Sequence, residues 1–225
     1  MSYKRPALLS ARPDDINFTR AMAGVGMNFA SEADYSADIE VTLLHASLLG
    51  MEEHDLRVLS VLSTWLGVHH RHLNVDRLIR GARELTSQRA RGYWAAVATW
   101  LTQDRRFHRL LSLHEGAPVE LLQVGSAFQI TRHGEDERFK GSALLVPKGA
   151  LRDRVVDVLT PVTLAQRHPV YRGRVLMGPS WRADVWVALE QNPNVSVSEL
   201  ARRVGCSFAT AWQVAQDYSV LYPTS

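Results

Sequence analysis

The sequence predicts a mainly helical protein with a small β element, in the α+β class. Two observations indicate this fold class. Through most of the 225 residues, apolar side chains recur every three or four positions, which is the spacing of one buried helix face. After Ala117 the pattern changes to short apolar runs separated by glycine-containing turns, which is typical of strands. We therefore expect a β-hairpin or a three-stranded sheet within a chain of helices.

Length and composition are those of a globular protein rather than of a disordered or membrane-embedded one. The chain is 46% apolar and 22% charged, and its 225 residues suffice for about two domains. No apolar run approaches the length of a membrane span, and residues 1–20 lack the apolar core of a signal peptide. The single cysteine, Cys206, excludes an internal disulfide. We expect a cytoplasmic protein that does not associate with membranes.

A net charge of +3 conceals an uneven distribution. Residues 1–70 carry 5 basic and 9 acidic side chains, and residues 110–225 carry 12 basic and 11 acidic ones. Residues 71–109 between them carry 9 arginines against 3 acidic side chains, a net charge of +6. This middle block is where a polyanion such as double-stranded DNA is expected to bind.

The chain divides into three predicted parts. Residues 1–35 contain two prolines and two glycines with little periodicity, and we expect a partly extended N-terminal arm that orders against a partner. Residues 36–170 form a helical domain that holds the β element, and residues 171–225 form a C-terminal helical unit.

The helical domain opens with two predicted helices. The first covers residues 39–49 and ends at Gly50, a residue favoured just after a helix C-terminus. The second covers residues 54–66 and ends at Gly67. Three histidines follow within residues 69–72, but they form no pair at helical spacing beside a carboxylate and have no cysteine nearby, so no metal site is predicted. Neutral or phosphate-facing histidines are the expectation.

Two arginine-rich helices come next. Asn74 can cap the first, and Trp94 and Trp100 belong to the apolar face of the second. Arginine pairs well with phosphate, so arginines along the outer faces of these helices would follow a DNA backbone. A solvated helix face in an arginine-rich protein explains the same pattern. The candidate phosphate contacts are Arg77, Arg80 and Arg83 on the outer face of the first helix and Arg89 and Arg91 at the start of the second.

The predicted β element contains two or three short strands. Apolar runs at residues 119–124, 127–130 and 143–146 are separated by glycines, and a hairpin is expected at residues 133–138. Attached to the preceding helices, such a hairpin would make the domain winged-helix-like. Its tip at residues 135–137 is acidic and would be repelled by phosphates, so the hairpin would not enter a DNA groove tip-first.

The stretch before the C-terminal unit predicts little regular structure. A short helix is expected at residues 151–159, with Val155 and Val156 facing inward. Pro161 interrupts the pattern, and residues 163–180 form a predicted connection that is rich in proline, glycine and arginine. The domain boundary is expected near residue 170.

The C-terminal unit predicts three helices within residues 181–220. Ser196 can cap the middle helix, with Glu199 completing a capping box. Gly205 stands where a tight turn needs a positive φ, and Ser207 can cap the last helix. A short turn between two helices with facing apolar sides predicts a steep crossing angle.

The segment SELARRVGCSFATAWQV resembles the helix-turn-helix of bacterial transcriptional regulators. The resemblance implies that the last helix enters the major groove, with its early residues at the base edges. Ser207, Thr210 and Gln213 are the candidate base contacts. Arg202 and Arg203, at the end of the preceding helix, are candidate phosphate contacts. One such motif reads a short half-site, so a homodimer is expected.

The same helix also suggests a different ligand. Residues 207–225 contain no arginine or lysine, and Asp217 adds a negative charge. Phe208 and Trp212 lie four positions apart and adjoin on the face expected to point outward, which is typical of a protein interface. A protein-interaction module, with Phe208 and Trp212 as partner-binding residues, is therefore the alternative to a DNA-binding regulator.

A wider resemblance covers most of the chain. The phrases RVLMGPSWRADVW and GCSFATAWQVAQD, supported by WLGVH and FQITRHGEDERFKG, are similar to a family of bacterial proteins encoded beside nucleotidyltransferase-like partners. This resemblance implies a regulator, or an antitoxin that represses its own operon, with a nucleotidyltransferase-like protein as partner. It implies no catalytic residue. No glycine-rich phosphate loop, GxSxG or HExxH motif occurs, so we expect neither an enzyme nor a cofactor.

Overall fold

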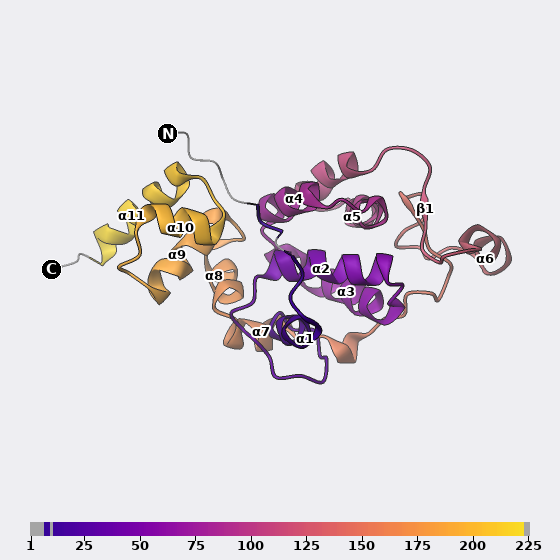
Figure 1. Cartoon of the computed structure of the whole chain (residues 1–225), viewed down its shortest axis with the longest axis horizontal. Helices are drawn as coiled ribbons and strands as arrows, with labels where there is room; N and C mark the ends of the chain where they lie inside the picture. The colour runs from indigo at the N-terminus through magenta and orange to yellow at the C-terminus, as the bar shows by residue number, and fades with distance from the viewer. Residues whose placement is uncertain (1–6, 10, 223–225) are drawn as a thin grey trace.

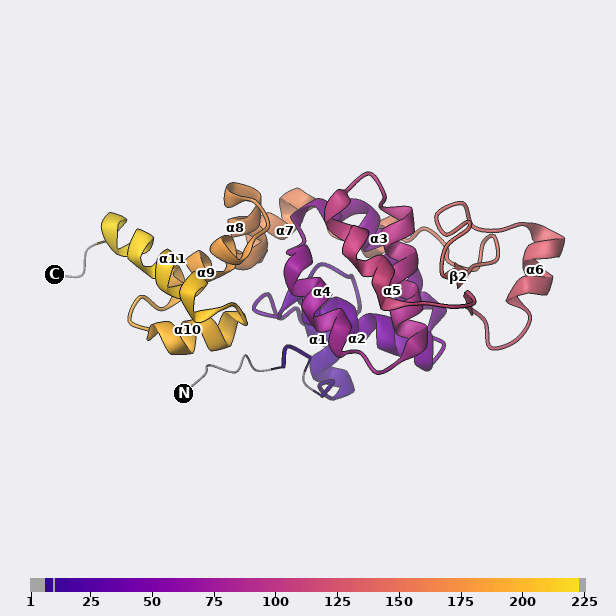
Figure 2. The same ribbon diagram turned by 90° about the horizontal axis from the view of Figure 1, so that it is seen from above.

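The computed structural model describes residues 7–9 and 11–222. The molecule is elongated, with its parts in a row (Figure 1, Figure 2). A helical body (residues 11–113) occupies the middle, and the C-terminal unit (residues 180–222) lies at one end. A small lobe with the helix α6 (Ser126–His133) lies at the other end.

The helices of the body begin at side-chain caps. Asp14, Asp38, Asp55, Asn74 and Ser87 each accept a hydrogen bond from the backbone N–H three residues ahead. These caps satisfy amide groups that have no partner within the helix, and the cap predicted at Asn74 is confirmed. The elements are α1 (Asp15–Gly24), α2 (Ile39–Glu52), α3 (Leu56–His69), η1 (His70–His72), α4 (Val75–Glu84), α5 (Gln88–Trp100) and η2 (Arg105–Leu113), where η marks a 3-10 helix.

One hydrophobic core holds the body together. Trp65 of α3, Trp94 of α5 and Phe107 of η2 are fully buried in it. The indole of Trp94 donates a hydrogen bond to Ser47 Oγ at 2.9 Å, so this buried donor is satisfied. The apolar face predicted for α5 is confirmed: Trp94 is buried, and Trp100 is half-buried and packs against the core.

The prediction of a partly extended arm at residues 1–35 is wrong for residues 15–24, which form α1. Phe18 and Met22 of this helix are buried in the body core. The indole of Trp65 also donates a hydrogen bond to the carbonyl oxygen of Val25 at 2.8 Å. The segment is therefore ordered by its own chain. Residues 1–6 and 10 of the expected arm lie outside the described residues.

The prediction that helices end at Gly50 and Gly67 is wrong, because both glycines lie inside helices. α2 continues through Gly50 to Glu52, and α3 continues through Gly67 to His69. A Cβ atom at Gly50 would lie 2.2 Å from Leu59 Cγ. The absence of a side chain at position 50 therefore allows α2 and α3 to pack closely, and a turn is not its role.

The β element is a pair of two-residue parallel strands, β1 (Val119–Glu120) and β2 (Leu144–Leu145). The predictions of a hairpin at residues 133–138 and of a strand at residues 127–130 are both wrong, because residues 126–133 form α6. Gly125, at φ 89°, turns the chain into this helix, and Ser126 Oγ accepts a hydrogen bond from the Leu122 amide at 2.9 Å. This local turn outweighs the strand-like apolar run. The chain is mainly helical with a small sheet, but the two strands are not the arms of a hairpin.

Two capped helices replace the connection predicted before the C-terminal unit. They are α7 (Pro161–Arg167) and α8 (Pro169–Met177), which are capped by Thr160 and His168. Each begins with a proline, which is well suited to the first helical position because it needs no hydrogen-bond acceptor. The helix predicted at residues 151–159 is reduced to η3 (Val155–Asp157), and its two valines are exposed rather than inward.

The three predicted helices of the C-terminal unit are confirmed as α9 (Trp181–Gln191), α10 (Val197–Val204) and α11 (Phe208–Leu221). Ser196 and Ser207 cap α10 and α11, and Gly205 adopts φ 80° between them, as predicted. These helices enclose a second, smaller core that is separate from the core of the body. It contains Val185, Leu189, Leu200, Ala201, Val204, Cys206, Ala211 and Val214.

Three histidines are buried within the fold. The two ring nitrogens of His69 contact the Tyr171 hydroxyl at 2.8 Å and the Leu159 carbonyl oxygen at 2.9 Å. His168 caps α8 through Nδ1. Burial lowers the pKa of His45, His69 and His168 to about 4. All three are therefore neutral at neutral pH, and His69 is a core residue that does not face a phosphate.

We expect the free energy of unfolding to fall as the pH drops from about 6.5 towards about 4, because in this window the unfolded chain binds protons that the folded chain does not. The effect reaches roughly 3 kcal/mol for each of the three histidines. Urea denaturation at a series of pH values measures it. His168→Asn retains a cap for α8 and removes one titrating group, so its pH dependence should be shallower. An unchanged pH dependence in this variant would contradict the assignment.

Candidate functional site

The outer face of α11 is open to solvent. Ala211 and Val214 point into the small core, so the intervening side chains point away from it. Phe208 and Trp212 are 42% and 48% exposed, and Gln213 is exposed beside them. The aromatic pair therefore does not pack under the rest of the chain. We define the α11 face by Phe208, Ala209, Trp212 and Gln213, all of which are exposed.

The predicted base contacts are also tied to α11 itself. Ser207 Oγ accepts a hydrogen bond from the Thr210 amide at 3.0 Å and contacts the Thr210 hydroxyl at 2.7 Å. Gln213 Nε2 donates to Asp217 Oδ1 at 3.2 Å. Ser207 and Thr210 are half-buried, whereas Gln213 is exposed. Of the three residues, Gln213 is the one whose side chain can reach furthest from the helix.

The C-terminal unit carries little positive charge. Residues 180–222 contain three arginines against two aspartates and two glutamates, a net charge of −1. Arg202 pairs with Glu199 at 2.6 Å along α10. Arg203 is exposed and makes no hydrogen bond or ion pair with the described residues. Exposed ion pairs contribute little stability, so both arginines of α10 can turn towards a phosphate.

The arginines of α4 and α5 do not form the phosphate-contacting strip that the sequence predicts. Arg77 is buried, not outward, and its guanidinium pairs with Asp38. Arg80 donates a hydrogen bond to the carbonyl oxygen of Gly205, at the turn between α10 and α11. Arg89 donates to two backbone carbonyl oxygens, at 2.9 and 3.1 Å. These three arginines hold parts of the chain together.

The last two candidates of this group lie close to one another. Arg91 is half-buried and donates to the carbonyl oxygen of Arg83 at 3.2 Å, and Arg83 itself is exposed. Helical spacing predicts one outward row for Arg77, Arg80 and Arg83, but Arg77 and Arg80 contact Trp181 and Gly205 of the C-terminal unit. Only Arg83 therefore keeps the exposure that a backbone contact requires.

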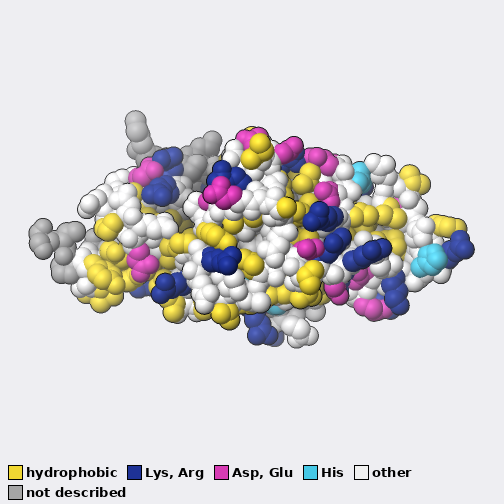
Figure 3. Space-filling model, turned by 90° about the horizontal axis from the view of Figure 1, so that it is seen from below, with side chains coloured by type: hydrophobic (Ala, Val, Ile, Leu, Met, Phe, Trp, Pro, Cys, Tyr) yellow, Lys and Arg dark blue, Asp and Glu magenta, His cyan; other side chains and the backbone are white. Residues whose placement is uncertain are grey.

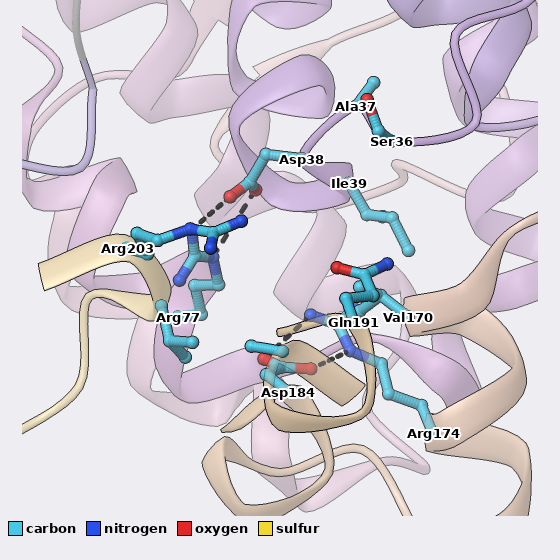
Figure 4. Close-up of a pocket in the computed structure, with 12 residues that line it drawn as sticks. Ser36, Ala37, Asp38, Ile39, Arg77, Val170, Arg174, Asp184, Gln191 and Arg203 are labelled. Atoms are coloured by element: carbon cyan, nitrogen blue, oxygen red, sulfur yellow. Dashed lines mark hydrogen bonds and ion pairs between the residues drawn. The ribbon is translucent and has the colours of Figure 1, made fainter. Parts of the chain in front are cut away.

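Buried charges define the junction between the body and the C-terminal unit. Arg174 of α8 lies between Glu40 of α2 and Asp184 of α9, and all three side chains are buried. Its guanidinium donates to the two oxygens of Glu40 at 2.6 and 2.9 Å and to those of Asp184 at 2.7 and 3.0 Å. Figure 4 shows Arg174 and Asp184 facing one another from separate helices. We call Asp38, Glu40, Arg77, Arg174 and Asp184 together the ionic junction.

Neighbouring groups complete the hydrogen bonds of the junction. The backbone amide of Asn74 donates to Glu40 at 3.0 Å, and its side-chain amide donates to Asp184 at 2.8 Å. The guanidinium of Arg77 also lies over the ring of Trp181, 5.7 Å from the ring centroid. The body thus contacts the first residues of α9 through both charge and an aromatic ring.

Pairing favours the charged forms of Arg174 and Asp38 despite their burial. Burial acts to lower the pKa of Arg174, but Glu40 and Asp184 outweigh it and raise this pKa above its ordinary value. Burial acts to raise the pKa of Asp38, but Arg77 outweighs it and holds this pKa below its ordinary value. Each charge is stable only with its partner, since an unpaired buried charge is strongly destabilising.

A cavity of about 150 Å³ adjoins the ionic junction (Figure 4). Asp38 and Arg77 line it from the body, and Gln191 and Arg203 line it from the C-terminal unit. Arg203 therefore lies at the boundary between the two parts as well as beside the turn that leads to α11.

Sequence reasoning missed the ionic junction. The available signal was a charged residue among apolar neighbours, as with Glu40 in IEVTLLH and Asp184 in WRADVWVALE. Charged residues are rarely fully buried unless they are paired. Such a signal indicates a buried partner but does not name it, because Glu40 and Arg174 are 134 positions apart in the chain.

Comparisons with known proteins leave the resemblances of the sequence untested. No protein-family model matches the chain, and neither does any curated protein or solved structure. Among the described helices, none is long and apolar enough to cross a membrane. The described residues also contain no group of three or more histidine, cysteine or acidic side chains that could hold a metal ion.

Replacing Arg174 by methionine should lower the free energy of unfolding by about 3–5 kcal/mol, because Glu40 and Asp184 would stay buried without a cation. Chemical denaturation followed by circular dichroism measures the change. Arg132→Met, at an exposed position of α6, is the matched control and should change stability by less than about 0.5 kcal/mol. Equal effects in the two variants would contradict the role of Arg174.

Proposed function

We propose that the protein is a regulator that binds double-stranded DNA through the α11 face. The observation that carries the proposal is the outward exposure of the first two turns of α11, in a three-helix unit whose α10–α11 turn is tight and glycine-centred. A helix-turn-helix places the corresponding helix in the major groove, with its N-terminal residues at the base edges. The polar and small side chains at the start of α11 suit this position.

The side chains of the α11 face favour A·T base pairs. Glutamine can form two hydrogen bonds with adenine, which makes Gln213 the main candidate for base recognition. Phenylalanine and alanine make apolar contacts with the methyl group of thymine, and Phe208 and Ala209 are exposed for such contacts. Arginine, the usual partner of guanine, is missing from α11. An A·T-rich half-site is therefore the expected target.

Few cations are available for the DNA backbone. Arg202, Arg203 and Arg83 are exposed, whereas Arg77, Arg80 and Arg89 serve the fold. Each phosphate contact contributes to affinity and to its dependence on salt, so a single protomer should bind weakly and with a shallow salt dependence. Pairing two protomers would double the contacts and read two half-sites. Repression of its own operon, as in an antitoxin, is the regulatory role that the sequence resemblance suggests.

The proposal predicts binding to the DNA upstream of the protein's own coding sequence. Fluorescence anisotropy with short duplexes, at about 50 and about 200 mM salt, measures affinity and salt slope. Gln213→Ala should weaken specific binding by about 1–3 kcal/mol, roughly 5- to 150-fold, through loss of an adenine contact. Gln123→Ala, at an exposed position of the opposite lobe, is the matched control. Undetectable binding at low salt, or equal binding by both variants, would refute the proposal.

A second candidate function is a protein-interaction module, favoured by the exposed aromatic pair and by the net charge of −1 on the C-terminal unit. Exposed aromatic residues commonly anchor partner proteins. The nucleotidyltransferase-like protein suggested by the sequence resemblance is the candidate partner, which the module would neutralise or scaffold.

The second candidate predicts that the protein co-purifies with the product of the neighbouring gene when the two are expressed together. Trp212→Ala should reduce the affinity of this complex by more than about 30-fold, as expected of a hot-spot residue that contributes about 2 kcal/mol or more. Phe128→Ala is the matched control, because Phe128 is an exposed aromatic residue on the distant α6. Calorimetry on the purified pair measures both variants, and a complex unaffected by Trp212→Ala would exclude this anchor.

A further inference from the structure

The outer sides of α7 and α8 form a second exposed apolar surface, separate from the α11 face. Two neighbouring hollows of about 510 and 370 Å³ lie on it and share Ala165, Gln166 and Arg172 in their linings. The view from below shows hydrophobic side chains gathered over this part of the molecule, with arginine among them (Figure 3). The surface is thus both apolar and hollowed.

The last turn of α8 carries apolar side chains on its solvent-exposed side, where they contribute nothing to the core of the chain. Tyr171 and Arg174 already bury the inner side of α8. Val175, Leu176 and Met177 nevertheless remain exposed, and Leu176 is 72% exposed. Contiguous exposed apolar side chains on a water-facing surface mark a place where another surface binds. We define the α8 face by Val175, Leu176 and Met177 together with the 370 Å³ hollow beside them.

Opposite charges stand at the edge of this hollow. Arg172 of α8 and Glu190 of α9 both line it, and both side chains are exposed. Arg172 makes no ion pair with any described residue, and the Glu190 carboxylate accepts a hydrogen bond from the Trp186 indole at 3.2 Å. The lining therefore presents a carboxylate, Glu190, and two arginines without an ion pair to any described residue, Arg172 and Arg167, of which Arg167 donates to the Tyr35 hydroxyl at 2.9 Å.

This arrangement is complementary to itself. In an interface with two-fold symmetry, when one residue of the first copy contacts a different residue of the second copy, the same contact also occurs with the two copies exchanged. Two α8 faces related in this way would bring Arg172 of each copy to Glu190 of the other. The exposed Leu176 of each copy would then have the hollow of the other to enter.

We propose that the α8 face binds a second copy of this chain and forms a symmetric homodimer. Each interface would hold two Arg172–Glu190 ion pairs around an apolar centre that contains both copies of Leu176. A charged rim around an apolar core is the usual anatomy of a protein–protein interface. The inference does not depend on DNA binding, because the dimer forms without a ligand.

Sedimentation equilibrium on the full chain, without DNA, tests the proposal. The wild-type protein should be a dimer, and Leu176→Asp should weaken association by about 100-fold or more, because it places two carboxylates in an apolar centre. Val156→Asp is the matched control: Val156 is 86% exposed on η3, outside the α8 face, and its replacement should leave the dimer unchanged. Circular dichroism confirms that each variant is folded.

Charge reversal tests the predicted pairing independently of the apolar centre. Arg172→Glu and Glu190→Arg should each dissociate the dimer, because each places like charges opposite one another. The double variant should dimerise again, since both ion pairs are restored with reversed polarity. A monomeric wild type, a dimer that survives Leu176→Asp, or a double variant that remains monomeric would each overturn the proposed interface. If the dimer forms as expected but no DNA is bound, only the proposed DNA binding fails.

Discussion

The buried guanidinium of Arg174 bridges the two parts of this molecule. Arg174 donates to both oxygens of Glu40 in the body and to both oxygens of Asp184 in the C-terminal unit. Because the cation and both anions are buried, separating any one of them from its partner would leave an unpaired buried charge, which is strongly destabilising. The direction in which the C-terminal unit points is therefore set by charge pairing in addition to apolar contact. α11 packs against α9, the helix that carries Asp184, so the junction also helps to fix where α11 lies.

The chain uses arginine mainly to build its structure. It contains 23 arginines and 3 lysines, and several of the arginines in the most basic segment donate to carbonyl oxygens or carboxylates of the same chain. The guanidinium suits this role, because it stays charged when buried and offers five donors in a fixed geometry. An arginine-rich segment therefore need not be a surface for nucleic acid. In this protein most arginines of residues 71–109 form hydrogen bonds or ion pairs within the chain.

The two surfaces proposed for binding are connected through α8 and α9. α8 carries Arg174 on its inner side and the α8 face on its outer side, and α9 packs against both α8 and α11. Two copies joined through their α8 faces would therefore hold two C-terminal units in a fixed relation. The α11 face has few cations with which to contact DNA. Such pairing would compensate, because a second half-site adds contacts without adding charge to the helix. The proposed dimer would therefore strengthen the proposed binding of DNA, although it would form without DNA.

The sequence by itself determined the features that depend on neighbouring residues. The helices of the C-terminal unit, their caps at Ser196 and Ser207, and the turn at Gly205 follow from local hydrogen bonding and backbone conformation. So do the cap at Asn74 and the mainly helical class. Short-range rules placed Gly50 and Gly67 at helix ends, although both lie inside helices. At Gly50 the reason is that close packing between helices uses glycine as readily as a turn does.

Only the tertiary structure decided which charges are buried and which surfaces are free. Arg77 has the spacing of an outward helix position, yet it is buried because its guanidinium pairs with Asp38 and lies over the ring of Trp181. Glu40, Arg174 and Asp184 meet from three distant segments, and no local pattern can pair them. The helix at residues 126–133 likewise replaces a predicted strand, because the turn at Gly125 and the bonds of Ser126 fix the backbone there. The physical reason is the same in each case: burial and pairing are properties of the assembled chain, whereas periodicity describes one segment at a time.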